Sequence, residues 1–236
     1  MNAYINLAYC TVTIFTVSKP VHDFLTDAYN LSTPEDSRDF YGRWADTYDK
    51  VFIKQYQYVF PSKVATVIAK HIPSQGRFTI IDLGCGTGEL GLHIAQLCPN
   101  TEIEGVDITP EMLKLASSKL RNDGTSVYTD LHEADLSDTI YFAANHFDFL
   151  VSAGTFTLGH LGAYELLDSL CVCRKGATII VGVNEQHWIE QDFEALIAES
   201  VKSGTITKPR YELVDIYTQG STHHASKGRV VIFKKN

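Results

Sequence analysis

The sequence predicts an α/β fold, in which a mostly parallel seven-stranded sheet carries helices on both faces. Two observations lead to this prediction. From residue 78 onward, short β-branched apolar runs alternate with helical patterns, which is typical of βα units in a parallel sheet. The chain then closes with two strand-like runs that no helix separates. We therefore expect these two runs to pair antiparallel.

Length and composition indicate one globular domain. The chain has 236 residues, of which 44% are hydrophobic and 20% charged, as in proteins with a sizeable core. We expect an N-terminal extension at residues 1–30 and one domain at residues 31–236, beginning with a helical lid at residues 31–75. The net charge of −8 provides no basic nucleic-acid footprint, so a small-molecule partner is the better expectation.

The cysteines and the N-terminus indicate a cytoplasmic protein. The five cysteines are odd in number and form no CxxC pair, so we expect reduced thiols and no metal site. The first 17 residues are apolar, but they are too few to span a bilayer and lack the basic start of a signal peptide. We expect no membrane or nucleic-acid partner, and a monomer or homodimer.

Two helices precede the alternating units. Pro34 suits the first position of a helix whose N-cap is Ser32 or Thr33, and acidic residues follow it at the positive end of the helix dipole. This pattern predicts a helix that continues through residues 39–52 and a second helix over residues 61–72. Both would form a cap over the carboxyl ends of the strands, where ligands bind in such sheets.

The alternating units then run to the C-terminus. The predicted strands cover residues 78–84, 102–108, 126–135, 147–154, 177–184, 211–219 and 228–236. The predicted helices cover residues 88–98, 109–120, 163–173 and 188–204, with a further short helix after the third strand.

The first unit carries a glycine loop between its strand and its helix. Such a loop places backbone N–H groups and the positive end of a helix against an anion. The spacing is GxGxG, with Asp82 ahead of it, rather than the GxGxxG of dinucleotide sites. An acidic residue there disfavours a pyrophosphate and suits the ammonium of S-adenosylmethionine, whose carboxylate would face the loop amides. An ordinary tight turn is the alternative. The residues expected to bind this cofactor here are Asp82, Gly84, Cys85, Gly86 and Gly88.

The next two strands end in acidic residues that suit the rest of this cofactor. Asp107 is placed to accept bonds from both ribose hydroxyls, and we expect Thr109 to cap the following helix and leave Asp107 free. Asp135 is placed to accept a bond from the adenine amino group. Capping is the alternative for both carboxylates. The remaining expected adenine contacts are the side chains of Ile108 and Met112 and the N–H of Leu136.

These residues together resemble the class I S-adenosylmethionine-dependent methyltransferases. The segments "IDLGCGTGELG", "EGVDITPEML" and "HEADL" look like the first three motifs of that class. The resemblance implies a Rossmann-like sheet whose last strand is inserted antiparallel. More narrowly, "TPEDSRDFYGRWADTYDKVF", "VSAGTFTLGHL", "RKGATIIVGVN" and "GRVVIFKK" resemble methyltransferase-like proteins first named for the Williams–Beuren syndrome region, which are presumed to act on small molecules.

By this resemblance, the first helix closes over the cofactor. Its Tyr41, Trp44 and Tyr48 fall at i, i+3 and i+7, so they share one face. Aromatic rings near a sulfonium would add cation–π attraction of ~0.5–2 kcal/mol. Ordinary core packing of an amphipathic helix is an equal alternative. Ser152, on the fourth strand, completes the expected cofactor contacts.

Methyl transfer from a sulfonium is an in-line displacement, so the enzyme mainly orients and dehydrates the acceptor. The fourth strand lacks the Asn/Asp-Pro-Pro-Tyr of many amino-group methyltransferases, which argues against an amide or nucleobase nitrogen as acceptor. His160 is the candidate general base, with a structural role in its loop as the alternative. The expected acceptor-binding residues are Phe156, Trp188, His223 and His224, of which the last two also suit a solvated hairpin tip.

We therefore expect an S-adenosylmethionine-dependent methyltransferase that acts on a small molecule. Two alternatives remain: an enzyme that uses the sulfonium in another reaction, such as a lyase or a modified-cofactor transferase, and a non-catalytic protein that binds S-adenosylmethionine. A nucleotide-binding oxidoreductase is a weaker alternative, because Glu89 stands where its fingerprint needs a third glycine.

Overall fold

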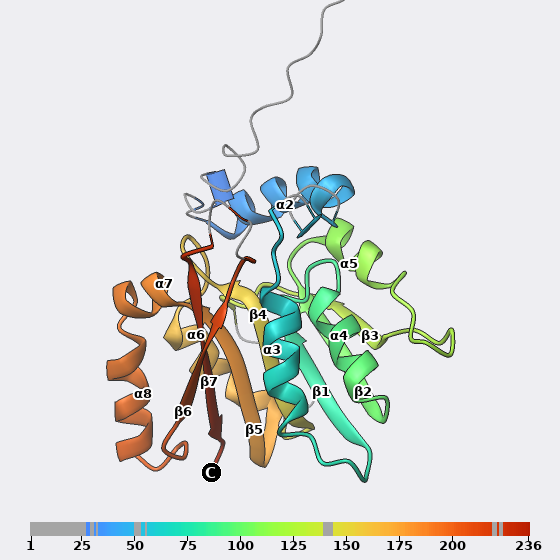
Figure 1. Cartoon of the computed structure of the whole chain (residues 1–236). Helices are drawn as coiled ribbons and strands as arrows, with labels where there is room; N and C mark the ends of the chain where they lie inside the picture. Colours follow the sequence, from blue (N-terminus) through green and yellow to red (C-terminus); the bar gives the residue numbers. More distant parts are fainter. Residues whose placement is uncertain are drawn as a thin grey trace, which may run out of the picture.

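A computed structural model shows one sheet with helices on both faces (Figure 1). The structure describes residues 27–28, 31, 33–49, 53–54, 56–138, 144–218, 221 and 224–236. Most of the expected N-terminal extension, residues 139–143 after the third strand, and His223 lie outside these residues.

The elements follow the predicted alternation of strands and helices. The strands are β1 Phe78–Leu83, β2 Thr101–Asp107, β3 Tyr128–Glu133, β4 Phe147–Phe156, β5 Cys173–Asn184, β6 Arg210–Asp215 and β7 Lys227–Lys234. The helices are α2 Pro34–Tyr48, α3 Phe60–Ala69, α4 Glu89–Leu97, α5 Pro110–Ala116, α6 Ala163–Asp168, the 3₁₀ helix η2 Ser169–Val172, α7 Glu185–Glu190 and α8 Phe193–Lys202.

The sheet order confirms the predicted fold. The seven strands lie in the order β3-β2-β1-β4-β5-β7-β6. The pairs from β3 to β5 are parallel, whereas β7 pairs antiparallel with both β5 and β6. The last strand of the chain is thus inserted between β5 and β6, as in a Rossmann-like methyltransferase fold.

Two hydrophobic cores hold the helices against the sheet. Successive strand residues point to opposite faces, so the neighbours Ile80 and Ile81 are both fully buried but belong to different cores. Ile68 of α3 lies in the core of one face, and Ile197 of α8 lies in the core of the other. Both faces of the central strands are therefore covered, which is why β1, β4 and β5 are buried without a break over residues 80–83, 147–152 and 179–183.

One predicted helix, residues 188–204, is divided in the structure. Asn184 caps α7 directly after β5, because its side chain accepts the N–H groups of Gln186 and His187. The backbone of Asp192 then takes a left-handed conformation, with φ +49°, which ends one helix and starts the next. The result is two shorter helices, α7 and α8.

Helix α2 lies over the end of the sheet at which the parallel strands finish (Figure 1). Thr33 is its N-cap and forms a reciprocal capping box with Asp36, which satisfies two otherwise unpaired N–H groups. The helix buries Phe40, Trp44 and Ala45 on its inner side. This position closes the edge of the sheet that parallel α/β folds use for ligands.

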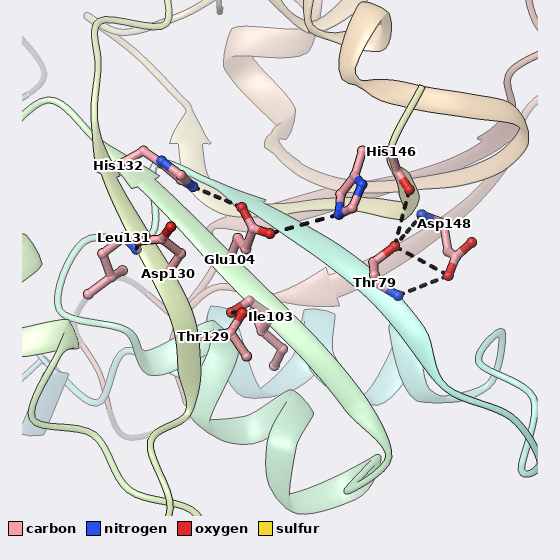
Figure 2. A network of polar contacts seen from close by, with 9 residues as sticks. All are labelled: Thr79, Ile103, Glu104, Thr129, Asp130, Leu131, His132, His146 and Asp148. Carbon is pink, nitrogen blue, oxygen red and sulfur yellow. Dashed lines mark hydrogen bonds and ion pairs between the residues drawn. The ribbon is translucent and has the colours of Figure 1, made fainter. Parts of the chain in front are cut away.

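A polar network crosses the sheet away from that edge (Figure 2). Near the start of β1, Asp148 accepts the N–H of Thr79 at 2.9 Å, which ties β1 to β4. Glu104 of β2 lies between His132 and His146, with its carboxylate 2.8 Å from the His132 ring. These bonds join neighbouring strands and contribute to the sheet rather than to the cavity described below.

Across the described residues, no helix is long and apolar enough to cross a membrane. Within the same ranges, no three His, Cys, Asp or Glu side chains gather as metal ligands. The thiols of Cys85, Cys98, Cys171 and Cys173 are free.

Candidate functional site

A cavity of about 380 Å³ lies at the carboxyl ends of the central strands. This volume is in the range of small-molecule sites, roughly 300–1,000 Å³. Its wall combines the glycine loop, the segments after β2 and β3, the end of β4, the loop after β4, and α2. The expected site residues that line it are Tyr41, Tyr48, Gly84, Cys85, Gly86, Asp107, Ile108, Met112, Asp135, Leu136 and His160.

The three loop glycines are required for different reasons. A Cβ on Gly84 would lie 2.0 Å from the hydroxyl oxygen of Thr155, and a Cβ on Gly88 would lie 2.9 Å from the ring of Tyr128. Gly86 also has a left-handed backbone, with φ +53°, but a Cβ there would meet no protein atom within 4 Å. Gly84 and Gly88 thus allow close packing against neighbouring side chains, whereas Gly86 leaves a space open beside the cavity.

Asp82 lies behind the glycine loop rather than in the cavity wall. Its side chain is 1% exposed, and its Oδ2 accepts a bond from the Tyr128 hydroxyl at 2.8 Å. Its Oδ1 has no hydrogen-bond partner among the described residues. Burial, with a smaller contribution from the charge of Asp107, raises the pKa of Asp82 to about 7. The cofactor contact expected for Asp82 is therefore not seen in the cavity wall.

Asp107 ties the glycine loop to the next helix. Its Oδ2 accepts the N–H of Gly86 at 2.8 Å, and its Oδ1 accepts the N–H of Thr109 at 2.9 Å. Thr109 is the N-cap residue of α5, as predicted, but its side chain makes no capping bond. The expectation that Asp107 is left free was wrong, because both of its oxygens accept backbone N–H groups. Burial raises the pKa of Asp107, although its backbone hydrogen bonds oppose this effect. Each carboxylate oxygen keeps a further lone pair for a ligand in the cavity.

An apolar cradle with one carboxylate forms the far end of the cavity. Ile108, Met112 and Leu136 line it, and their side chains suit the faces of a flat ring. Asp135 follows β3 and uses Oδ1 to accept the N–H of Ser137 at 2.8 Å and its hydroxyl at 2.7 Å. A local turn therefore occupies one oxygen of Asp135. The helix capping considered as its alternative role is not seen, because no helix begins at residues 136–138.

The C-terminal end of α2 is fastened to the glycine loop by a polar cluster. The Thr87 hydroxyl donates to Oδ1 of Asp49 at 2.7 Å, and Nζ of Lys119 lies 2.9 Å from Oδ2 of the same carboxylate. Lys119 also pairs with Glu89, the first residue of α4. Sequence reasoning assigned no role to this cluster, because Asp49 and Lys119 are 70 residues apart and no motif links them.

A second contact joins the middle of α2 to the loop after β4. Nδ1 of His160 lies 2.9 Å from the carbonyl of Leu158, and a carbonyl only accepts, so this nitrogen carries the proton. Nε2 is therefore the acceptor for the Tyr41 hydroxyl, 3.0 Å away. Burial lowers the pKa of His160, which favours this neutral form of the ring.

A smaller cavity of about 50 Å³ adjoins the first. We call it the aromatic cavity, because seven aromatic residues line it: Tyr41, Trp44, Tyr48, Tyr58, Phe60, Phe156 and Tyr217. The ring of Phe156 packs in the core on the other face of the sheet from Trp44, Phe60 and Tyr217. Tyr41, Tyr48 and Tyr58 also line the main cavity, so they form the wall between the two. The expected cofactor residue Trp44 and the expected acceptor residue Phe156 both lie here and not in the main cavity.

Besides Asp82, four other described residues that were expected in the site line neither cavity: Gly88, Ser152, Trp188 and His224. Ser152 is buried in β4 and donates to the Leu83 carbonyl at 2.7 Å. Trp188 is buried and stacks on Phe193, with the ring centroids 5.1 Å apart, because the immediate capping of α7 turns this face toward the core. His224 is exposed, and its Nδ1 donates to the carbonyl of Ser221.

Residues 80–175 match the family of the methyltransferase domain. Among curated proteins, the chain is 32% identical over 115 residues to malonyl-[acyl-carrier protein] O-methyltransferase of Anoxybacillus flavithermus, covering 48% of this chain and 38% of that protein. It is 34% identical over 77 residues to tRNA1(Val) (adenine(37)-N6)-methyltransferase of Yersinia pestis, covering 31% and 30%. The chain thus spans less than half the length of these curated relatives.

Solved structures share the fold at low sequence identity. Phosphoethanolamine N-methyltransferase 2 of Haemonchus contortus, solved with S-adenosylhomocysteine, matches with a TM-score of 0.59 and 11% identity, covering 86% of this chain and 59% of that one. The plantazolicin methyltransferase BpumL, also solved with S-adenosylhomocysteine, matches with a TM-score of 0.56 and 12% identity, covering 92% and 98%. The fold is therefore that of S-adenosylmethionine-dependent methyltransferases.

The buried carboxyl of Asp82 makes stability depend on pH. An ordinary aspartate pKa near 3.8 in the unfolded chain and a value of about 7 in the folded chain mean that the folded state binds the proton more tightly. The contribution of Asp82 to the free energy of unfolding is then greatest below pH 4 and falls as pH rises to about 7, by about 4 kcal/mol at ~1.4 kcal/mol for each pH unit. We expect Asp82→Asn to remove this decline in urea unfolding measured from pH 4 to 8.

The exposed Asp138 provides the control, since Asp138→Asn should keep the pH dependence of the wild type. An Asp82→Asn protein whose stability still fell by the same amount between pH 4 and 7 would show that Asp82 titrates normally.

Proposed function

We propose that this chain transfers the methyl group of S-adenosylmethionine to a small molecule by in-line displacement. It has the class I S-adenosylmethionine-dependent methyltransferase fold and matches the methyltransferase domain at residues 80–175. The observation that carries the proposal is the main cavity. Its walls combine an unobstructed glycine backbone at Gly86, a carboxylate at Asp107, and an apolar cradle. These features suit the amino-acid, ribose and adenine parts of one cofactor in that order.

The order of the strands supports this assignment of subsites. β1, β2 and β3 are neighbours in the sheet, and the three features follow the ends of those strands. The loop after β1 and the N-terminus of α4 would hold the cofactor carboxylate. Asp107, the last residue of β2, would accept ribose hydroxyls, and Asp135 with Leu136 after β3 would bind the adenine edge. One ligand lying along the edge would therefore meet all three.

Bound S-adenosylmethionine supplies a methyl group already activated on a sulfonium. The protein then mainly has to orient the acceptor and exclude water. Helix α2 suits that purpose, because the Asp49 cluster fixes its end and the Tyr41–His160 bond fixes its middle. The lid at residues 31–75 and the single domain at residues 31–236 are part of this proposal.

We propose a positioning role for His160. The sequence-based hypothesis of a general base stays a prediction, but Nε2, the lone pair that a base would use, accepts the Tyr41 hydroxyl. Abstraction of a proton from an acceptor would first require this bond to break. His160 is therefore better suited to holding Tyr41 between the two cavities.

A small-molecule acceptor fits the enclosed site and its charge. The described residues lining both cavities include no lysine or arginine, and the chain has a net charge of −8, whereas nucleic-acid sites are basic. The names of the curated relatives state an acyl carrier protein substrate for one and tRNA for the other. The narrower resemblance to the Williams–Beuren region proteins, a cytoplasmic location, and a monomer or homodimer belong to the same proposal.

The space beside Gly86 gives the first test of cofactor binding. We expect Gly86→Ala to weaken S-adenosylmethionine binding at least tenfold, about 1.4 kcal/mol, because the added methyl group enters the ligand space. Calorimetric titration measures this affinity. Gly124→Ala is a matched control: its backbone is also left-handed, with φ +83°, its Cβ would also meet nothing within 4 Å, and it lines neither cavity.

Both substitutions should lower the melting temperature to a similar extent, since both place alanine in a left-handed conformation. Equal cofactor affinity of Gly86→Ala and wild type would reject the assignment of this loop.

The Tyr41–His160 bond gives the second test. We expect Tyr41→Phe and His160→Gln each to raise the KM for the acceptor roughly twofold to tenfold, which is the effect of losing one hydrogen bond. We expect the double variant to be little worse than either single variant, because one shared interaction is lost. Formation of S-adenosylhomocysteine with an accepted substrate measures the rates, and also separates methyl transfer from a lyase reaction.

The pH profile of kcat distinguishes the two roles of His160. A positioning residue leaves the shape of the profile unchanged in His160→Gln. Loss of its acidic limb, together with a kcat decrease of a hundredfold or more, would instead identify His160 as the general base.

A further inference from the structure

We propose that the aromatic cavity receives the reacting end of the acceptor, and that this end is an amine. The inference rests on the proposed function, because it needs S-adenosylmethionine in the main cavity. It goes further by naming the place and the chemical class of the acceptor.

The sheet order places the aromatic cavity next to the reactive end of the cofactor. Along the edge, β4 follows β1, and β5 follows β4. The sulfonium of S-adenosylmethionine lies between its ribose and its amino acid. A cofactor whose ribose and amino acid lie over β2 and β1 therefore has its sulfonium near the end of β1, whose other neighbour in the sheet is β4. The aromatic cavity is lined from the ends of β4 and β5 by Gly154, Phe156 and Asn184. The methyl group would face this cavity across the wall between them.

The wall between the cavities is thin at the end of β4. Gly154 lines both cavities, and a Cβ on it would lie 2.8 Å from the Tyr58 hydroxyl. The remaining wall consists of the rings of Tyr41 and Tyr48, which come from the lid helix. At about 50 Å³, the aromatic cavity has space for a few water-sized groups. This space suits the reacting group of an acceptor, with the rest of the molecule outside.

The charges around both cavities disfavour an anionic acceptor. Carboxylates line the main cavity, at Glu89, Asp107, Asp135 and Glu165, and the described lining residues of either cavity include no lysine or arginine. The nearby Lys119 is already paired with Asp49 and Glu89. A carboxylate or phosphate in the aromatic cavity would lose its water without gaining a cationic side chain.

The aromatic cavity also lacks a group to remove a proton. Among its described lining residues there is no Asp, Glu, His or Lys. Burial raises the pKa of Tyr48 well above its ordinary value, so this phenol stays protonated. Hydroxyl and thiol acceptors must lose a proton during transfer. A neutral amine reacts without a base, because its nitrogen already carries a lone pair.

The transfer to an amine is balanced without any further reactant. The nitrogen lone pair forms the new bond to the methyl carbon, while the carbon–sulfur bond breaks and its electrons return to sulfur. S-adenosylhomocysteine leaves as a neutral thioether, and the methylated product is an ammonium that releases its proton to solvent. Positive charge thus moves from sulfur to nitrogen, into the cavity lined by Trp44, Tyr48 and Tyr217, where aromatic faces attract a cation.

Choline and 3,3-dimethylbutan-1-ol test this assignment, because they have the same shape and only choline carries a quaternary ammonium. The full chain is saturated with S-adenosylhomocysteine, and each probe is titrated by calorimetry. We expect choline to bind roughly threefold to thirtyfold more tightly than the neutral alcohol, the preference that aromatic faces give a cation. Equal affinities, or tighter binding of the alcohol, would overturn the inference.

Two variants localise the preference for the cation. Trp44→Leu and Tyr217→Leu should each reduce it to less than half of the wild-type ratio, while S-adenosylhomocysteine binding shows that the variant is folded. Tyr164→Leu is the control, since Tyr164 is 71% exposed and lines neither cavity, and it should keep the wild-type ratio. If both cavity variants kept the wild-type ratio, choline would bind elsewhere and the inference would be overturned.

The first titration separates this inference from the proposed function. If the wild-type chain does not bind S-adenosylhomocysteine, the proposed function fails. If it binds S-adenosylhomocysteine but does not discriminate the probes, only the aromatic cavity assignment fails. Labelled methyl transfer to propan-1-ol, propane-1-thiol or butanoate, with none to propylamine, would likewise overturn the amine assignment.

Discussion

The site depends on the hydrogen bond between the Asp107 carboxylate and the N–H of Gly86. This bond spans the ends of β1 and β2, and the second oxygen of Asp107 accepts the N–H of Thr109 at the start of α5. One buried carboxylate thus fixes the glycine loop in its left-handed shape and sets where the next helix begins. The apolar cradle that includes Met112 depends on that helix. Since a buried carboxylate needs partners, the bonds that shape the cavity also stabilise the charge that lines it.

The lid helix α2 is attached to the same glycine loop by side-chain contacts. Asp49, directly after α2, accepts the hydroxyl of Thr87 and pairs with Lys119, whereas the middle of α2 is held through Tyr41 and His160. The two contacts differ in chemistry: the first involves formal charges in a partly buried cluster, and the second is a neutral bond. A change in the loop after β4 would therefore remove the bond at Tyr41, while the buried side chains of Phe40 and Trp44 and the Asp49 cluster would still hold α2.

The sequence predicted the strands and the antiparallel pairing of the last two, because those depend on local periodicity and on the order of elements along the chain. The insertion of the last strand between β5 and β6 was expected only from the resemblance to the methyltransferase class. Eleven expected residues line the main cavity: most follow from the strand ends that meet at one edge, whereas Tyr41 and Tyr48 of α2 were expected from the resemblance. The prediction failed at residues whose side chains can point either into the core or toward the site. Trp188 and Phe156 both face the core around Phe193, and this direction is set by the capping of α7 and the packing of α8 rather than by spacing. Lys119 was missed for a related reason: its partners belong to α4 and to the end of the lid, so its role exists only after the chain has folded.

The aromatic residues of α2 show why lid packing and ligand binding are not exclusive alternatives. Trp44 is buried in the core and also lines the aromatic cavity, and Tyr41 and Tyr48 belong to both cavities. The apolar face that holds the lid on the domain is thus the surface that an acceptor would meet. An acceptor entering the aromatic cavity would replace part of the lid's own packing, so acceptor binding and lid closure would draw on the same apolar surface. An acceptor would therefore have to replace the packing contacts that the aromatic rings make with one another. This requirement favours a compact apolar group around the reacting atom.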